Sequence, residues 1–354
     1  MNMENPVDRI IFDTESVERF ISLSELEEWS EEDLNKFVFS KGVQYLIQQE
    51  RESGPNCSED AVKTFLKKAT QELSGELGGW ATAWKEKTRI RKRLEHILNR
   101  WDYLVARPLS TAKEYVPDWA REEGTCYFLP GGSKESYSGG KGFAVNLGHG
   151  AKSDPQLMFL ITRGAYHFWF TTIAGEDSCI QACKTPSEFI ETFLDLTHRE
   201  GIAALVGVRA AGIEEQFFQE NVIDDEKKER YGEAFQRALE GKAPEADTMK
   251  KIFSGYTSPA ALFGAIMAKK LEECDLGTGR SFGKDVLYTT IVKGGFFVFF
   301  EMYQACAKDS PLLPDTVWKA YEKVRRERNT LTPKNRSTYP WIDEHELPNQ
   351  SSDI

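Results

Sequence analysis

The sequence predicts an α+β protein that is predominantly α-helical, with a small β-sheet or hairpin packed on helices. Capping-box patterns and helix-starting prolines recur along the chain, which is typical of a mostly helical protein. One glycine-rich stretch near the middle separates two short apolar segments that are typical of strands. The 354 residues, 40% of them apolar and 12% aromatic, are enough to bury a sizeable core.

Residues 1–118 are expected to form an N-terminal helical region. Residues 22–25 and 30–33 both resemble capping boxes at the start of short helices. A longer helix is expected over about 81–104, with a basic face that is either an anion-binding patch or a solvated surface offset by neighbouring glutamates. We favour the solvated surface. The basic residues concerned are Lys85, Lys87, Arg89, Arg91, Lys92 and Arg93.

Residues 119–330 are expected to form the core. Strands are predicted at 126–130 and 142–147, on either side of a flexible glycine-rich loop at 131–140. These strands should form a hairpin or belong to one small sheet.

Helices are expected in the remainder of the core. Ser153 or Asp154 can cap a helix that reaches about residue 172, and Thr185 can cap a second that reaches about 206. Further helices are predicted over about 224–239, 258–277, 286–306 and 314–328. Residues 331–354 are polar, contain three prolines, and are predicted to be a flexible tail.

Charge and apolar pattern argue against several classes of protein. The formal net charge of −11 argues against nucleic acids and anionic membranes as partners. No apolar run approaches the roughly 18 residues of a membrane span, and the N-terminal residues lack the features of a signal peptide. Six cysteines are too sparse for a disulfide scaffold, so we expect reduced thiols and a cytoplasmic protein. The oligomeric state is not predicted.

The most informative residues lie in two of the predicted helices. Arg163 and His167 are four positions apart and therefore share one helix face. Thirty-three residues after His167, on the next predicted helix, comes the phrase Glu200-Gly201-Ile202-Ala203. The glycine-rich strand segment precedes both helices.

This order resembles the gluzincin-type zincins, in particular the putative zinc-dependent peptidases of bacteria. The resemblance covers about residues 120–325 and implies a zincin-like core. In those families two histidines of H-E-x-x-H bind zinc, the glutamate between them activates water, and a glutamate within E-G-[IL]-A supplies the third ligand. Glu200 and the three residues after it match the last phrase, and residues 288–295 and 314–321 resemble the downstream helices.

The departure from the family pattern is as informative as the match. The first zinc ligand is replaced by Arg163, which stays protonated and cannot coordinate a metal, and the general base is replaced by Gly164. We expect Arg163 to form a buried ion pair with Glu200 in place of the metal, with His167 hydrogen-bonded to the same group. A glycine inside a helix costs roughly 1 kcal/mol relative to alanine, so Gly164 predicts either a closely approaching ligand or backbone, or tight packing.

Three functions follow from these residues. The first is a pseudo-zincin that is not a peptidase, needs no cofactor, and binds a small molecule or peptide in the former active-site cleft. The second is a repurposed metal-independent enzyme acting on a small anionic or aromatic substrate. Its candidate catalytic residues are Arg163, His167, Glu200, Tyr166 and Tyr288. The third is a metallohydrolase in which His149, His167 and Glu200 bind zinc or another divalent transition metal.

Four other features are interpreted as ordinary structure. His198 is expected at the surface, since it lies two positions from Glu200 and points away from it. Cys179 and Cys183 are expected to be ordinary thiols. The glycine-rich segment 277–283 is expected to be a helix stop and turn, and His345 to lie in the tail.

Overall fold

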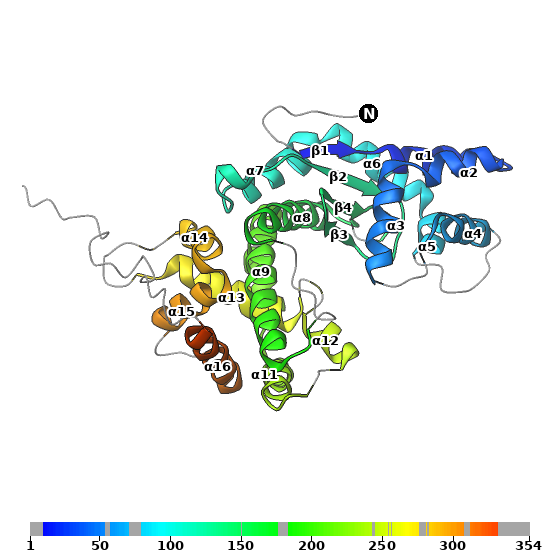
Figure 1. Cartoon of the computed structure of the whole chain (residues 1–354). Coiled ribbons are helices and arrows are strands. Elements are labelled where there is room, and N and C mark those ends of the chain that lie inside the picture. The colour runs from blue at the N-terminus through cyan, green and yellow to red at the C-terminus, as the bar shows by residue number, and fades with distance from the viewer. Residues whose placement is uncertain are drawn as a thin grey trace, which may run out of the picture.

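The computed structural model describes residues 10–53, 57–70, 79–149, 151–175, 183–242, 245–253, 255, 257–275, 281, 283–307 and 312–331. Helices predominate and one small mixed sheet is present, which confirms the predicted α+β, mostly helical class (Figure 1). Most of the predicted tail and of the 277–283 turn, together with Cys179 and His345, lies outside the described residues. Across the described residues, no helix is both long enough and apolar enough to cross a membrane.

The sheet has four strands in the order β1-β2-β4-β3. β1 and β4 both run parallel to β2, while β3 is antiparallel to β4. The two predicted strands, β2 and β4, are therefore neighbours in one sheet but do not form the hairpin. The hairpin joins β3 to β4 through Gly140 at φ +58°, inside the segment predicted to be a loop. The strands are β1 (Ile10–Asp13), β2 (Gly124–Leu129), β3 (Ser136–Gly139) and β4 (Gly142–Asn146).

Short helices make up most of the chain before β2. β1 also lies in this region, where only helices were predicted. The second predicted capping box is confirmed, because Ser30 accepts from the Asp33 backbone and Asp33 accepts in return. The first is wrong, because Ser22 lies inside α1 and its hydroxyl donates to the Glu18 carbonyl. The helices are α1 (Glu15–Glu25), α2 (Glu31–Val38), α3 (Lys41–Ser53), α4 (Glu59–Thr70), α5 (Trp80–Lys85), α6 (Lys87–Asn99), a π-helical turn (Asp102–Ala106), α7 (Arg107–Lys113) and a 3-10 turn (Asp118–Ala120).

The arginines on the basic face of α6 pair with neighbouring carboxylates. Arg89 pairs with Glu86 at 2.7 Å, and Arg91 pairs with Glu25 at 2.6 Å. Arg93 reaches Asp154, the first residue of α8, at 2.7 Å. This arrangement favours the interpretation of a solvated, ion-paired surface over that of an anion-binding patch.

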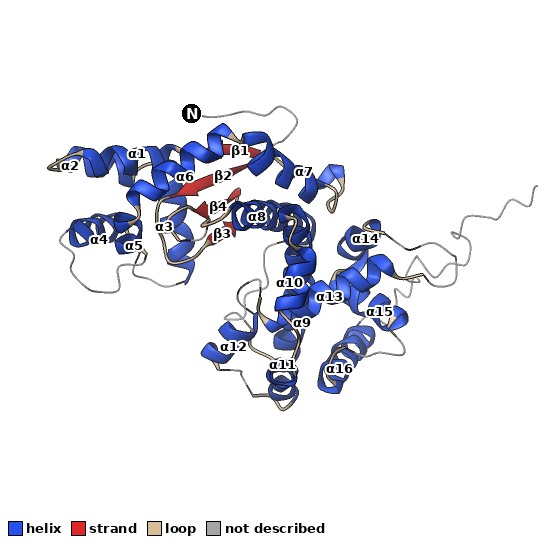
Figure 2. Ribbon diagram, turned by 180° about the vertical axis from the view of Figure 1, so that it is seen from behind, coloured by secondary structure: helices blue, strands red, loops and turns tan. Residues whose placement is uncertain are grey.

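Helix α8 (Asp154–Ala174) lies between the sheet and α9 (Pro186–Ala211) (Figure 2). It thus connects the sheet-containing N-terminal part of the molecule to the C-terminal helices. Both predicted N-caps are confirmed: Ser153 accepts from the Gln156 backbone, and Thr185 forms a full capping box with Glu188. α8 contacts both β4 of the sheet and α9 of the C-terminal helices. It is therefore the element that positions the candidate site.

The C-terminal helices pack around α9, and the segment predicted as one helix over 286–306 is two. It breaks at Gly295, whose φ of +61° is incompatible with a continuous helix. Helices α9 and α13 cross closely, since a Cβ on Gly201 would lie 2.2 Å from the Gly264 carbonyl carbon. The helices are α10 (Glu214–Glu220), α11 (Asp225–Leu239), α12 (Ala246–Phe253), α13 (Pro259–Glu273), α14 (Asp285–Gly294), α15 (Phe296–Cys306) and α16 (Asp315–Leu331).

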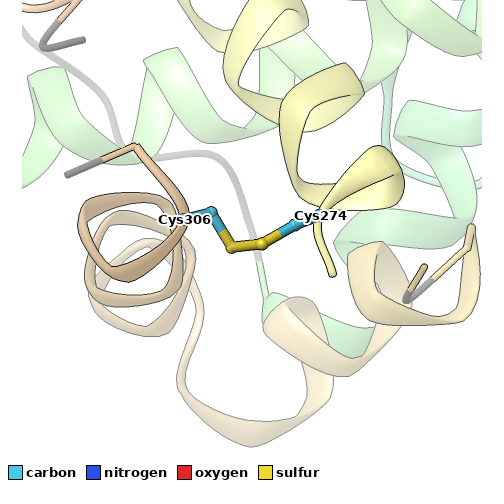
Figure 3. The surroundings of a disulfide bond; sticks show 2 residues. All are labelled: Cys274 and Cys306. Atoms are coloured by element: carbon cyan, nitrogen blue, oxygen red, sulfur yellow. A yellow bond between two sulfur atoms is a disulfide. The ribbon is translucent and has the colours of Figure 1, made fainter. Parts of the chain in front are cut away.

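One disulfide corrects the expectation that all six cysteines are reduced. Cys274, just after α13, is bonded to Cys306 at the end of α15, 32 positions later (Figure 3). Cys57 and Cys126 are free thiols. The predicted cytoplasmic location loses the support that it drew from the cysteines and stays a prediction.

Candidate functional site

The site predicted from the sequence lies at the contact between α8 and α9. An Nη2 of Arg163 is 2.6 Å from Oε2 of Glu200, so the predicted ion pair is confirmed. His167, one turn along α8, places its Nε2 3.5 Å from the same oxygen, which is longer than a strong hydrogen bond. The side chains of Arg163 and Glu200 keep 17% and 15% of their surface exposed, and that of His167 only 7%. The three groups are thus nearly enclosed.

The charges in this cluster stabilise the ionised form of Glu200. Burial alone would raise the pKa of its carboxyl, because a charge is poorly solvated in the interior. The Arg163 guanidinium, and after it His167, outweigh burial and hold the pKa of Glu200 well below its ordinary value. Glu200 is therefore a carboxylate at neutral pH, and this carboxylate is already paired with the Arg163 guanidinium.

Gly164 faces the sheet and not a ligand cavity. A Cβ at this position would lie 2.4 Å from Cδ2 of Phe143, a fully buried residue of β4. Of the two interpretations of Gly164, the structure therefore favours tight packing. The same packing leaves no room for a glutamate at the position that carries the general base in zincins.

The residues present do not fit a zinc ion. No group of three or more His, Cys, Asp or Glu side chains in the described ranges is arranged to hold a metal. His149 is exposed in the turn after β4, where its backbone N–H donates to the Asn146 side chain at 3.1 Å. The structure thus does not bring His149 together with His167 and Glu200, and the rebuilt three-ligand site is not formed.

The two candidate tyrosines differ in accessibility. Tyr166 is fully buried, and its hydroxyl has no hydrogen-bond partner among the described residues. Burial raises the pKa of Tyr166 well above its ordinary value. Tyr288 is half-buried on α14. Tyr166 is therefore a core residue that a substrate cannot reach from solvent, while Tyr288 stays a candidate.

The expectation that His198 lies at the surface is wrong. His198 is fully buried, because its side of α9 is covered by α14. Its Nε2 is hydrogen-bonded to the hydroxyl of Thr290 at 3.0 Å. Burial and then the neighbouring Arg199 lower the pKa of His198 to about 3, so the imidazole is neutral.

A pocket that the sequence analysis missed lies on the flank of the same helix pair. It has a volume of about 620 Å³ and is formed where α9 faces the junction of α14 and α15. Such a volume suits a small organic ligand. Its lining comprises Ala174, Cys183, Glu188, Glu191, Thr192, Asp195, Arg199, Ile291, Val292, Lys293, Gly294, Gly295, Phe296, Phe297 and Arg328.

Charges of both signs surround this pocket. On α9, Arg199 pairs with Asp195 at 2.8 Å, and its guanidinium lies 4.6 Å from the centre of the Phe170 ring. Arg328 of α16 lies 3.8 Å from Glu191, while Lys293 is exposed at the rim. Two sequence signals mark this place in retrospect. They are the Gly-Gly pair that breaks the 286–306 segment, and the charged residues of α9 that recur at helical spacing.

Comparison with known proteins adds no relative. The chain matches no protein-family model, no curated protein and no solved structure.

Proposed function

We propose that this protein is a pseudo-zincin: a metal-independent binding protein with a zincin-like core that takes a short peptide and does not hydrolyse it. The observation that carries the proposal is the Arg163–Glu200 ion pair between α8 and α9. The guanidinium supplies a positive charge where the resemblance implies a zinc ion, and Glu200, the one matching acidic ligand, neutralises it. His167 remains beside the pair at 3.5 Å.

The packing of α8 supports the loss of peptidase chemistry. Zincin hydrolysis needs a general base next to the metal-bound water. At the corresponding position Gly164 carries no side chain, and Phe143 fills the space that a carboxylate would need. Neither the Lewis acid nor the base has a substitute within the described cluster.

The pocket between α9 and the α14–α15 junction supports a zwitterionic ligand. Its acidic side chains, Asp195 and Glu191, can accept hydrogen bonds from a peptide amino group. Lys293 and the first backbone N–H groups of α15 can bind a carboxylate, since a helix N-terminus favours an anion. Phe296 and Phe297 offer apolar surface between these poles. A short peptide with an apolar side chain combines all three features.

The test is calorimetric titration with the dipeptide Ala-Phe in the presence of a metal chelator. We expect saturable binding that the chelator does not alter, and no cleavage of the dipeptide. The blocked analogue N-acetyl-Ala-Phe-amide, which lacks both charges, should bind at least tenfold more weakly. Lys293→Gln should weaken binding of Ala-Phe, whereas Lys270→Gln, a matched substitution on α13 outside the pocket, should not.

Two results would overturn the proposal. One is equal affinity for the charged and the blocked peptide, because the pocket would then not recognise the terminal ammonium and carboxylate groups. The other is cleavage of Ala-Phe that the chelator abolishes, because the protein would then be a metallopeptidase.

A metal-independent enzyme is the second candidate, and the partial exposure of the Arg163–Glu200 pair favours it. About one sixth of each side-chain surface is exposed to solvent, so part of the pair can be approached from outside. His167 and Tyr288 would act as proton donor or acceptor in that case. Turnover that is lost in His167→Ala and unaffected by chelator would select this function over simple binding.

A further inference from the structure

A second cavity, away from the α8–α9 contact, lies between α3 and the sheet. It is an open groove of about 900 Å³, with α3 forming one wall and β2 and the β3–β4 turn forming the other. Figure 1 shows α3 lying across the strands at this end of the sheet. The lining residues are Lys41, Gln44, Tyr45, Ile47, Gln48, Arg51, Tyr127, Gly139, Gly140 and Lys141.

The groove is positively charged although the chain as a whole carries −11. Lys41 and Lys141 are both exposed, and neither forms an ion pair with any residue that the structure describes. Arg51 pairs with Glu59 at 3.0 Å and also donates to the Cys57 carbonyl. None of the described lining residues is acidic. Two exposed lysines on opposite walls of one groove favour an anionic ligand, although the Asp13 and Glu15 carboxylates lie near Lys41.

Two tyrosines provide a fixed aromatic surface between these cations. The ring of Tyr45 stacks on that of Tyr127, with 4.8 Å between centroids and 25° between planes. The Tyr45 hydroxyl is 3.1 Å from the Gly139 carbonyl and 2.9 Å from the Gly142 carbonyl, which fixes the ring on the sheet. Both tyrosines are only half-buried. A planar ring can therefore stack here on a surface that is already ordered.

The floor and the turn of the groove leave room for such a ligand. Gly140 has φ +58°, and a Cβ there would meet nothing within 4 Å, so the turn is open. Asp13, the register partner of Tyr127, is the nearest acidic group on the sheet. It is 4% exposed, and burial raises the pKa of its carboxyl, while the charge of Lys41 acts in the opposite direction. Its side chain accepts from the Glu15 backbone and does not line the groove.

We propose that this groove binds a small ligand of the mononucleotide class, with a planar ring against the Tyr45–Tyr127 pair and an anionic phosphate between Lys41 and Lys141. The site shares no residue with the peptide pocket, so the proposal stands independently of the proposed function. The exposed amide of Gln48 lines the same wall and can hydrogen-bond to the ring edge or the sugar, whereas the amide of Gln44 is held by the Val38 carbonyl at 2.9 Å.

The test is calorimetric titration of the full chain with AMP, and with adenosine and inorganic phosphate as its two halves. At 50 mM salt we expect AMP to bind at least tenfold more tightly than either half, because the groove contacts both parts. Lys41→Gln/Lys141→Gln should weaken AMP binding at least about tenfold, as expected for lost charge-assisted hydrogen bonds. Tyr127→Leu should weaken the binding of AMP and adenosine about fivefold or more, and leave phosphate binding unchanged.

The control is Lys228→Gln/Lys242→Gln, which removes the same charge on and after α11. This variant should bind AMP like the natural chain, and so should Lys293→Gln from the peptide pocket. Failure of AMP to bind at millimolar concentration would overturn the proposal. Equal affinities for AMP and phosphate, or unchanged AMP binding in Lys41→Gln/Lys141→Gln, would overturn it too. The lysine variants keep the test decisive if Tyr127→Leu does not fold.

Discussion

Arg163 of α8 and Glu200 of α9 form an ion pair of 2.6 Å across the contact between these two helices. Each charge makes the burial of the other tolerable. Because α8 also packs on the sheet, this pair joins the sheet-containing part of the molecule to the C-terminal helices. It is at once the centre of the proposed function and a structural contact, and the two roles lead to separable predictions.

Removing one partner of the pair should be far more costly than removing both. We expect Arg163→Leu to lower the free energy of unfolding by about 3–5 kcal/mol, since it leaves the Glu200 carboxylate buried without a cation. Arg163→Leu/Glu200→Leu should recover most of this loss. Urea unfolding at pH 7 measures both variants, and equal losses in the single and double variants would show that Arg163 stabilises by packing and not by charge.

The buried imidazole of His198 should make stability depend on pH. In the folded protein its pKa is lowered to about 3, whereas an unfolded histidine titrates near 6.5. Below pH 6.5 the unfolded chain therefore binds a proton that the folded chain does not, and stability falls as pH falls. The slope approaches about 1.4 kcal/mol per pH unit between pH 6.5 and 4.5. Below about pH 4.5, protonation of Glu200 in the unfolded chain adds to the loss, because its folded pKa is also depressed.

The measurement is urea unfolding of the natural chain and of His198→Gln at pH 7.5 and pH 5. Glutamine can keep the hydrogen bond to Thr290 but does not titrate. The loss of stability between the two pH values should be smaller in His198→Gln. The same pH dependence in both proteins would mean that another group controls it.

The crossing of α9 and α13 should not tolerate a methyl group. A Cβ on Gly264 would lie 2.0 Å from the Thr197 carbonyl oxygen, and one on Gly201 would meet the Gly264 backbone. Since backbone atoms cannot turn aside, we expect Gly201→Ala and Gly264→Ala each to cost at least about 2 kcal/mol, despite alanine's higher helix propensity. Gly232→Ala on α11, whose nearest contact is the Thr316 hydroxyl at 3.0 Å, should cost less. Thermal unfolding compares the three variants.

The disulfide should stabilise the C-terminal helices. Its bridge closes a loop of 32 positions around α14, so we expect Cys274→Ser/Cys306→Ser to lower the free energy of unfolding by about 2–4 kcal/mol. Dithiothreitol should destabilise the natural chain by a similar amount and have no effect on the variant. Equal stability of the natural chain with and without reductant would contradict this role of the bridge.

Local patterns in the sequence predicted what local forces decide. The caps at Ser30, Ser153 and Thr185 follow from side chains that bond the next turn of backbone, and they are found where expected. The caps needed no knowledge of distant contacts. The Arg163–Glu200 pair did, since its residues lie 37 positions apart on two helices, and it was expected only because the resemblance to zincins implies that both positions belong to one site.

Features that depend on distant contacts were missed. β1 has only four residues, too few for a periodic signal, and it is ordered by pairing with β2 more than 100 positions later. His198 was assigned to solvent because the sequence does not say that α14 covers that side of α9. The Cys274–Cys306 bridge and the pocket at Gly295 likewise require the packing of helices that are separate in the chain.

The most direct test of the central claim is elemental analysis of the natural chain, purified without chelator or added metal. If the Arg163 guanidinium occupies the place of a metal, the folded protein should contain far less than one zinc or other transition metal per chain. His167→Ala should then leave the metal content unchanged. About one metal ion per chain, lost in His167→Ala, would contradict the account.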